Sequence, residues 1–74
     1  MRKTWVRGKL LRIEGRKKIH VIKFDGATAP TWVRPDLIYD SDVEEPGESG
    51  LFQIPEWLAA NEELAEAEIG DPYA

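Results

Sequence analysis

The sequence of 74 residues contains no cysteine, so disulfides and thiolate metal sites are excluded. No apolar run approaches the roughly 18 residues that a membrane-spanning helix requires. The first apolar pair, Leu10-Leu11, is followed at once by Arg12, which argues against a signal peptide. We therefore expect one small domain over residues 1–70 with a tail at 69–74, located in the cytoplasm and without membrane contact.

Basic residues are absent from the second half of the chain. Residues 1–40 hold all ten Lys and Arg and four acids, a net charge of +6, whereas residues 41–74 hold ten acids and no base, a net charge of −10. Together they give the total of −4. This asymmetry predicts a basic surface on one part of the molecule and an acidic surface on the other, unless the two parts neutralise each other in the fold.

The first forty residues have the composition of β-strands joined by short turns. In the first strand Val6 and Leu10 share one parity, while Leu11 and Ile13 share the other. Gly8 lies where this alternation begins to fail, which predicts a bulge or sharp bend. The predicted strands are 4–14, 18–24 and 31–34, with turns at 14–17 and 25–30 and a 3₁₀ turn or a last piece of strand at 36–39.

The second half predicts a loop, a short strand and a helix. Residues 40–50 are rich in Asp, Glu, Pro and Gly, which predicts a mobile acidic loop. Residues 51–54 are apolar enough for a fourth strand. Pro55 suits the first position of a helix over about 55–68, whose expected apolar stripe is Trp57, Ala60, Leu64 and Ala67, with Leu58 beside it. The predicted fold is mainly β: a bent antiparallel sheet of three to four strands, or a small SH3-like barrel, with one C-terminal helix.

Residues 18–38, KIHVIKFDGATAPTWVRPDLI, resemble the middle of SH3-like and Tudor-like barrels. In those folds a hydrophobic strand enters an Asp-Gly turn and returns through an aromatic strand. The resemblance implies an aromatic cage, for which Trp32 and Tyr39 are the candidates, although no cage motif matches residue by residue. Together with IPEWLAANEEL at 54–64, the segment WVRPDLI is also similar to short proteins of phages and bacteria, which suggests an accessory or inhibitor protein.

The chain offers little for catalysis or for cofactor and metal binding. Its one histidine, His20, alternates with Ile19 and Val21 and is expected on the solvent side of its strand. Ser41 and Ser49 lie in the acidic loop, a poor place for a nucleophile. The acids at 40–45 lack the order of a calcium-binding loop, and no phosphate-binding glycine motif occurs. We expect neither an enzyme nor a bound cofactor or metal.

A binding role remains, with a protein as the expected partner and nucleic acid as the alternative. An acidic helix could meet a basic protein surface, whereas a basic hairpin with exposed aromatics could track phosphates and stack bases. Self-association is a further option for so small a domain. The predicted contact residues are Arg12, Arg16, Lys17, Lys18, Trp32, Arg34, Tyr39, Glu62, Glu63 and Glu66.

Trp32 raises a specific question of orientation. Period-2 alternation places Thr31 and Val33 on one face and Trp32 and Arg34 on the other. Val33 is therefore the expected core residue. Trp32 is expected either in a solvent-accessible binding surface or beneath the C-terminal helix.

Overall fold

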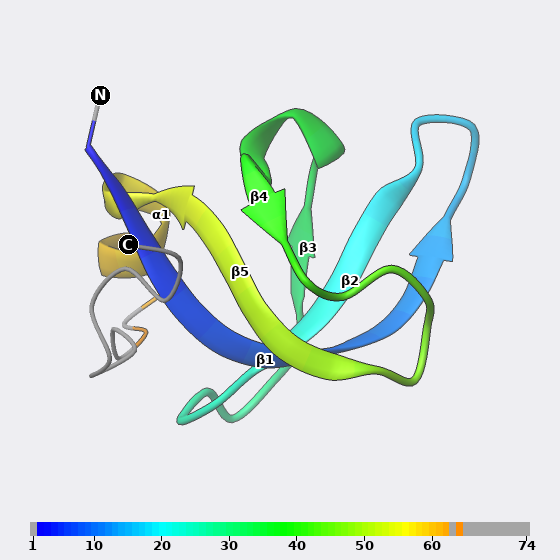
Figure 1. Ribbon diagram of the computed structural model, residues 1–74, viewed down its shortest axis with the longest axis horizontal. Helices are drawn as coiled ribbons and strands as arrows, with labels where there is room; N and C mark the ends of the chain where they lie inside the picture. The colour runs from blue at the N-terminus through cyan, green and yellow to red at the C-terminus, as the bar shows by residue number, and fades with distance from the viewer. Residues whose placement is uncertain (1, 63, 65–74) are drawn as a thin grey trace.

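The computed structural model describes residues 2–62 and 64 and places them in a five-stranded antiparallel sheet with one short helix. The hydrogen-bonded strand order is β3-β2-β1-β5-β4 (Figure 1). The elements are β1 (Lys3–Glu14), β2 (Ile19–Phe24), β3 (Thr31–Val33), the 3₁₀ helix η1 (Pro35–Leu37), β4 (Asp40–Ser41), β5 (Ser49–Pro55) and α1 (Glu56–Asn61). The predicted fold class is confirmed, with one more strand than expected because Asp40–Ser41 pairs with β5.

β1 is the central strand, and it belongs to two ladders. Its first part pairs with β5 and its second part with β2, and Gly8 lies in both, opposite Gly50 and Phe24. A Cβ atom at Gly8 would lie 3.1 Å from the Phe24 Cα and from the Lys23 carbonyl oxygen. Glycine therefore permits the close approach of β2 where β1 curves strongly between its partners (Figure 1).

The bulge in β1 lies at Leu11, three residues beyond the glycine where we predicted it. Leu10 pairs with Ile22 and Arg12 with Val21, so Leu11 is the extra residue. Because an extra residue reverses the alternation, the bulge accounts for the change of parity seen in the sequence. Ile13 is thereby returned to the side of the sheet that carries Leu10.

The hydrophobic core fills the concave side of the bent sheet. Phe24 and Phe52, both buried, meet edge to face with ring centroids 5.8 Å apart. Leu58, Ala59 and Leu64 add the side chains of the C-terminal segment to the same cluster. The other members are Val6, Leu10, Ile22, Val33, Val43 and Ile54, so Val33 is a core residue as predicted.

The sheet is bent but not closed. Its hydrogen-bonded order ends at β3 on one side and at β4 on the other. The two edge strands are joined through η1, and Leu37 and Ile38 pack against the core there. Of the two predicted forms, the open bent sheet is the one observed.

The acidic segment 40–50 contains more regular structure than predicted, since β4 and the start of β5 lie within it. The Glu48 carboxylate accepts hydrogen bonds from the backbone N–H groups of Glu44 and Glu45, at 3.0 and 2.8 Å. These bonds hold the pKa of Glu48 below its ordinary value. The backbone also pairs with β1: Leu10 N–H donates to the Glu48 carbonyl, and Gly47 N–H to the Leu10 carbonyl.

The helix is shorter than the predicted 55–68, and its buried face is different. Pro55 is the N-cap rather than the first helical residue, and α1 ends at Asn61. The buried helical residues are Leu58 and Ala59, whereas Trp57 is 48% exposed and Ala60 is exposed, so the predicted stripe is wrong at Trp57 and Ala60. Its member Leu64, and Leu58 beside it, are buried in the core. The buried side of this six-residue helix is the side that faces the sheet when the chain leaves β5. The hydrophobic periodicity of so few residues does not define that side. Residues 63 and 65–68 of the predicted helix, with the predicted tail 69–74, lie outside the described residues.

We predict that Gly8→Ala destabilises the protein by about 1–3 kcal/mol, because the added methyl group meets backbone atoms that cannot rotate away. Urea denaturation followed by circular dichroism measures the change. Ser49→Ala, at an exposed position opposite Lys9, is the control and should change stability by less than about 0.5 kcal/mol. Equal stability of Gly8→Ala and the wild type would contradict this account of the bend.

Candidate functional site

The convex side of β1, β2 and β3 carries a distinct set of side chains. The strand register places Lys9 opposite Lys23, Arg12 opposite Val21, and Val21 opposite Trp32. Cross-strand partners project on the same side of a sheet, and the core cluster occupies the other side. We call the surface formed by Arg7, Lys9, Arg12, Glu14, Val21 and Trp32 the convex face.

Trp32 lies across the neighbouring strand. It starts on β3, yet its indole Nε1–H donates a 3.1 Å hydrogen bond to Oε2 of Glu14 on β1, with β2 between them. The Arg12 guanidinium carbon lies 5.9 Å from the centroid of the indole ring. Val21, which is paired with both residues, is fully buried although it faces away from the main core. Trp32 and Arg12 therefore cover it.

Trp32 is 54% exposed, so it contributes to the surface and does not lie beneath α1. The one hydrogen-bond donor of the indole, Nε1–H, is directed at Glu14, so the exposed part of the ring offers its apolar surface to another molecule. The Arg12 Nε also donates to Glu14, so the two charges are paired. These hydrogen bonds, from Arg12 first and then from Trp32, hold the pKa of Glu14 below its ordinary value of 4.5.

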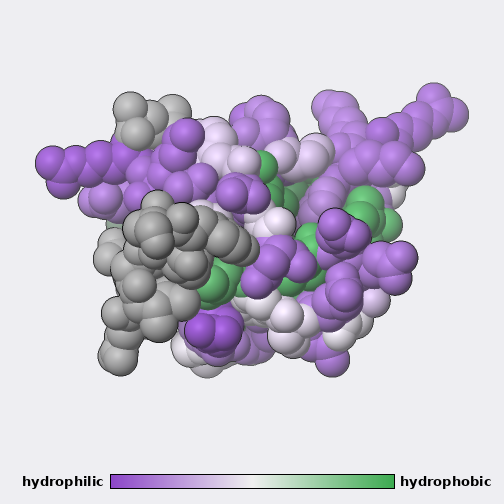
Figure 2. Space-filling view, in the orientation of Figure 1, coloured by the Kyte–Doolittle hydropathy of each residue, from purple (hydrophilic) through white to green (hydrophobic). Residues whose placement is uncertain are grey.

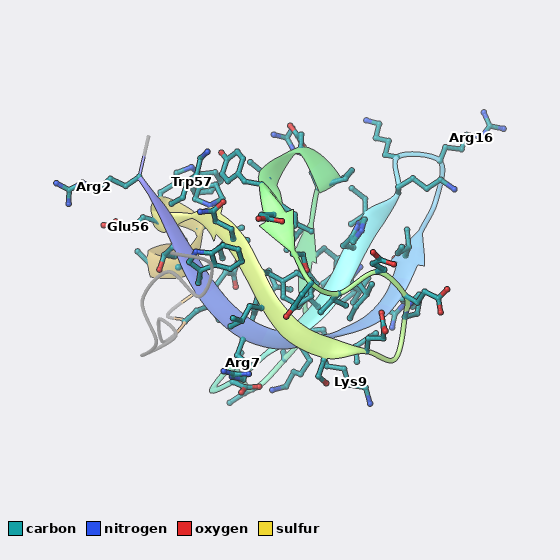
Figure 3. All side chains as sticks on the ribbon, viewed as in Figure 1. Arg2, Arg7, Lys9, Arg16, Glu56 and Trp57 are labelled. Atoms are coloured by element: carbon teal, nitrogen blue, oxygen red, sulfur yellow. The ribbon has the colours of Figure 1, made fainter. Side chains whose placement is uncertain are left out.

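Further basic side chains, which form no ion pair with a described residue, lie on the convex side of β1 and at the hairpin. Arg7 and Lys9 project from the convex side of β1, and Arg16 extends from the tip of the β1–β2 hairpin (Figure 3). Lys17 and Lys18 are exposed in the same turn, where Gly15 and Lys18 have φ values of 70° and 56°. Lys23, by contrast, donates from Nζ to the Ala27 carbonyl and so braces the β2–β3 connection.

Charges of the two halves do not neutralise each other within the described part of the chain. The ion pairs there are Arg12–Glu14 and Arg34–Asp36, and all of these residues belong to segment 1–40. The acids of the β4–β5 connection lie beside β1 through backbone hydrogen bonds, but they form no ion pair with a described base. The face seen in Figure 2 is largely hydrophilic, with small apolar areas near its centre.

The remaining predicted contact residues are dispersed. Arg34 forms an exposed ion pair with Asp36, with 3.4 Å between Nε and Oδ1. Tyr39 lies at the opposite end of β1 from Trp32, with Lys3 Nζ 4.4 Å from its ring centroid, so these two aromatics do not form one cage. Glu62 is exposed at the C-cap of α1. Glu63 and Glu66 lie outside the described residues.

The residues weighed for catalysis have structural contacts. His20 lies opposite Val33, on the side of β2 that carries Ile22, so the predicted side of the strand is wrong. It is partly exposed there, and its Nδ1 lies 2.8 Å from the Lys18 carbonyl oxygen. Ser41 Oγ donates to the Leu51 carbonyl and accepts from Val43 N–H. Within residues 2–62 and 64 there is no group of three or more His, Asp or Glu placed to hold a metal, and no helix long and apolar enough to cross a membrane.

Sequence reasoning missed two residues that matter for the surface. Glu14 was assigned to the end of the first strand and the start of its turn, and nothing local indicates that it would meet Trp32, which is 18 positions away. Trp57 was assigned to the core, although it is exposed. A signal for Trp57 was present, since Leu58 and Ala59 follow it directly and offer an alternative apolar side.

Comparison with known proteins finds no relative: no family model matches, and neither a curated protein nor a solved structure is significantly similar to the chain.

We predict that the pKa of Glu14 lies below 4.5 and that the NMR signal of the Trp32 indole N–H shifts when the Glu14 carboxylate is protonated. Because the lowered pKa favours the carboxylate in the folded state, the contribution of these contacts to stability is complete above the ordinary pKa and is lost as the pH falls through the folded value. An NMR titration should show the Trp32 indole N–H signal moving with the Glu14 carboxyl carbon. Arg12→Ala should raise the Glu14 pKa, and Glu14→Gln should abolish the movement of the indole signal. An indole signal insensitive to pH in the wild type would contradict the contact.

Proposed function

We propose that this protein is a small cytoplasmic binding module, without catalytic activity, that contacts a partner protein through the convex face. The observation that carries the proposal is the half-exposed Trp32, held in place by Glu14 and Arg12, with bases on the same side of the sheet and at the hairpin that form no ion pair with a described residue. Such a surface acts by contact, since it provides recognition chemistry but no nucleophile or general base.

Trp32 and Arg12 have the properties of a binding hot spot. Tryptophan and arginine are the residue types that dominate the binding energy of protein interfaces. The hydrogen bond to Glu14 and the contact with Arg12 restrict the indole before any partner arrives, which lowers the entropy lost on binding. Val21 beneath them provides a buried floor. The partner is then expected to place an apolar or aromatic group against the exposed indole.

The charge of the convex face indicates an acidic partner surface. Arg7, Lys9 and the hairpin bases Arg16, Lys17 and Lys18 point into solvent, where carboxylates of a partner can pair with them. Such exposed charges accelerate encounter and select the partner more than they add affinity. The bases border the tryptophan on β1 and at the hairpin, which is the arrangement of an apolar centre with a charged rim.

Affinity capture from the native host tests this proposal. The wild-type protein should retain a partner that Trp32→Ala and Arg12→Ala each lose by at least about tenfold. Tyr39→Ala is the matched control, because Tyr39 also carries a cation over its ring but lies at the other end of β1. Retention of the same partner by Trp32→Ala at wild-type strength would exclude the convex face. Circular dichroism confirms that each variant is folded.

Single-stranded nucleic acid is the second candidate, because an exposed ring and free bases on one side also suit a stacked base and its phosphates. A titration with oligo-dT followed by tryptophan fluorescence discriminates the two. Nucleic-acid binding requires quenching of Trp32 and a slope of log K against log salt of about −0.7 for each phosphate contacted. In the triple variant Arg16→Glu, Lys17→Glu, Lys18→Glu the dependence of log K on log salt should then be less steep. The protein-contact proposal predicts no salt-dependent quenching by the oligonucleotide.

A further inference from the structure

The end of the molecule opposite the hairpin carries a second exposed aromatic surface. A shallow hollow of about 290 Å³ is lined by Arg2, Glu56, Trp57 and Ala60. Arg2 directly precedes β1, and the other residues belong to α1. The 2.9 Å hydrogen bond from Glu56 N–H to the Arg2 carbonyl holds the two segments together. Trp57 is 48% exposed there, while the next two residues, Leu58 and Ala59, are buried. α1 therefore presents its tryptophan to solvent.

The two charged residues of the hollow have opposite signs and do not pair. The backbones of Arg2 and Glu56 are joined by a hydrogen bond, but neither side chain forms an ion pair with a described residue. In Figure 3 the Arg2 side chain extends away from the body of the molecule beside Glu56 and Trp57. Among the described residues, the hollow thus exposes a cation, an anion and an aromatic ring.

We propose that this end is a self-association surface, on which a second copy of the chain docks about a two-fold axis. A two-fold interface brings the same patch from both subunits together, so a patch must complement itself. Arg2 of each copy pairs with Glu56 of the other, and each Trp57 packs into the hollow of its partner. One acid and one base beside an aromatic ring meet this requirement, whereas a patch whose charges all have the same sign would repel its own copy.

This surface lies away from the convex face, so dimerisation leaves the convex face of each subunit exposed. Arg2 and Trp57 lie at the end of β1 that is opposite Glu14, Trp32 and the hairpin with Arg16 (Figure 3). Both convex faces remain free in the dimer. A partner with repeated binding sites would then be held by two faces at once, which raises the apparent affinity without a new contact. The dimer itself does not depend on the proposed function.

Reciprocal charge reversal tests the interface by sedimentation equilibrium. The wild type should dimerise with increasing concentration, up to about 1 mM. Arg2→Glu alone places two acids against each other and Glu56→Arg alone places two bases together, so each variant should be monomeric at concentrations where the wild type is a dimer. An equimolar mixture of the two variants restores both opposite-charge pairs and should form a heterodimer. Trp57→Ala should weaken dimerisation by at least about tenfold.

Trp32→Ala is the matched control, since it removes the other half-exposed tryptophan and should leave the monomer–dimer equilibrium unchanged. Circular dichroism spectra establish that every variant is folded. A wild type that stays monomeric throughout the concentration range would overturn the proposal. It would be overturned equally by single charge variants that dimerise like the wild type, or by a mixture of them that remains monomeric. If Trp32→Ala captures the partner at wild-type strength while the wild type dimerises as expected, the proposed function is rejected and this interface stands.

Discussion

The bend of β1 is the constraint on which the rest of the structure depends. One strand pairs with β5 along its first part and with β2 along its second part, and Gly8 lies where the two ladders meet. The absence of a Cβ atom there allows the backbone of β2 to approach. The bend separates a concave side, which the core fills, from a convex side on which β1 and β3 expose Arg12, Glu14 and Trp32.

The convex face shows how an exposed tryptophan can be ordered in a small domain. Trp32 donates a hydrogen bond to Glu14, lies beside the cation of Arg12 and is paired with the buried Val21, and it still presents much of its ring to solvent. The contacts with Glu14 and Arg12 reach across β2, so the unit exists only when three strands are paired in the correct register. The bulge at Leu11 sets that register on β1 and directs Arg12 and Glu14 outward.

Part of this arrangement was predictable from local patterns. Alternation in the third strand identified Val33 as core and Trp32 as its opposite, and the change of parity in the first strand indicated an irregularity. The position of the bulge was not predictable, since any residue between the two parities could have been the extra one. The predicted orientation of α1 was wrong for a related reason. Trp57 on one side of the helix and Leu58 and Ala59 on another are all apolar, and the direction in which the chain leaves β5 determines which side is buried.

The sequence by itself determined the class of the protein and the segregation of its charges. Strand-forming runs broken by Gly and Asp turns define a β-rich domain, and no base follows Arg34 along the chain. Only the tertiary structure decided which charges remain unpaired and which aromatics are exposed. Those outcomes depend on contacts between residues far apart along the chain, as Glu14 and Trp32 show, and on one extra residue in β1. Local composition cannot specify such contacts, because pairing register reverses the side on which every later residue of a strand projects.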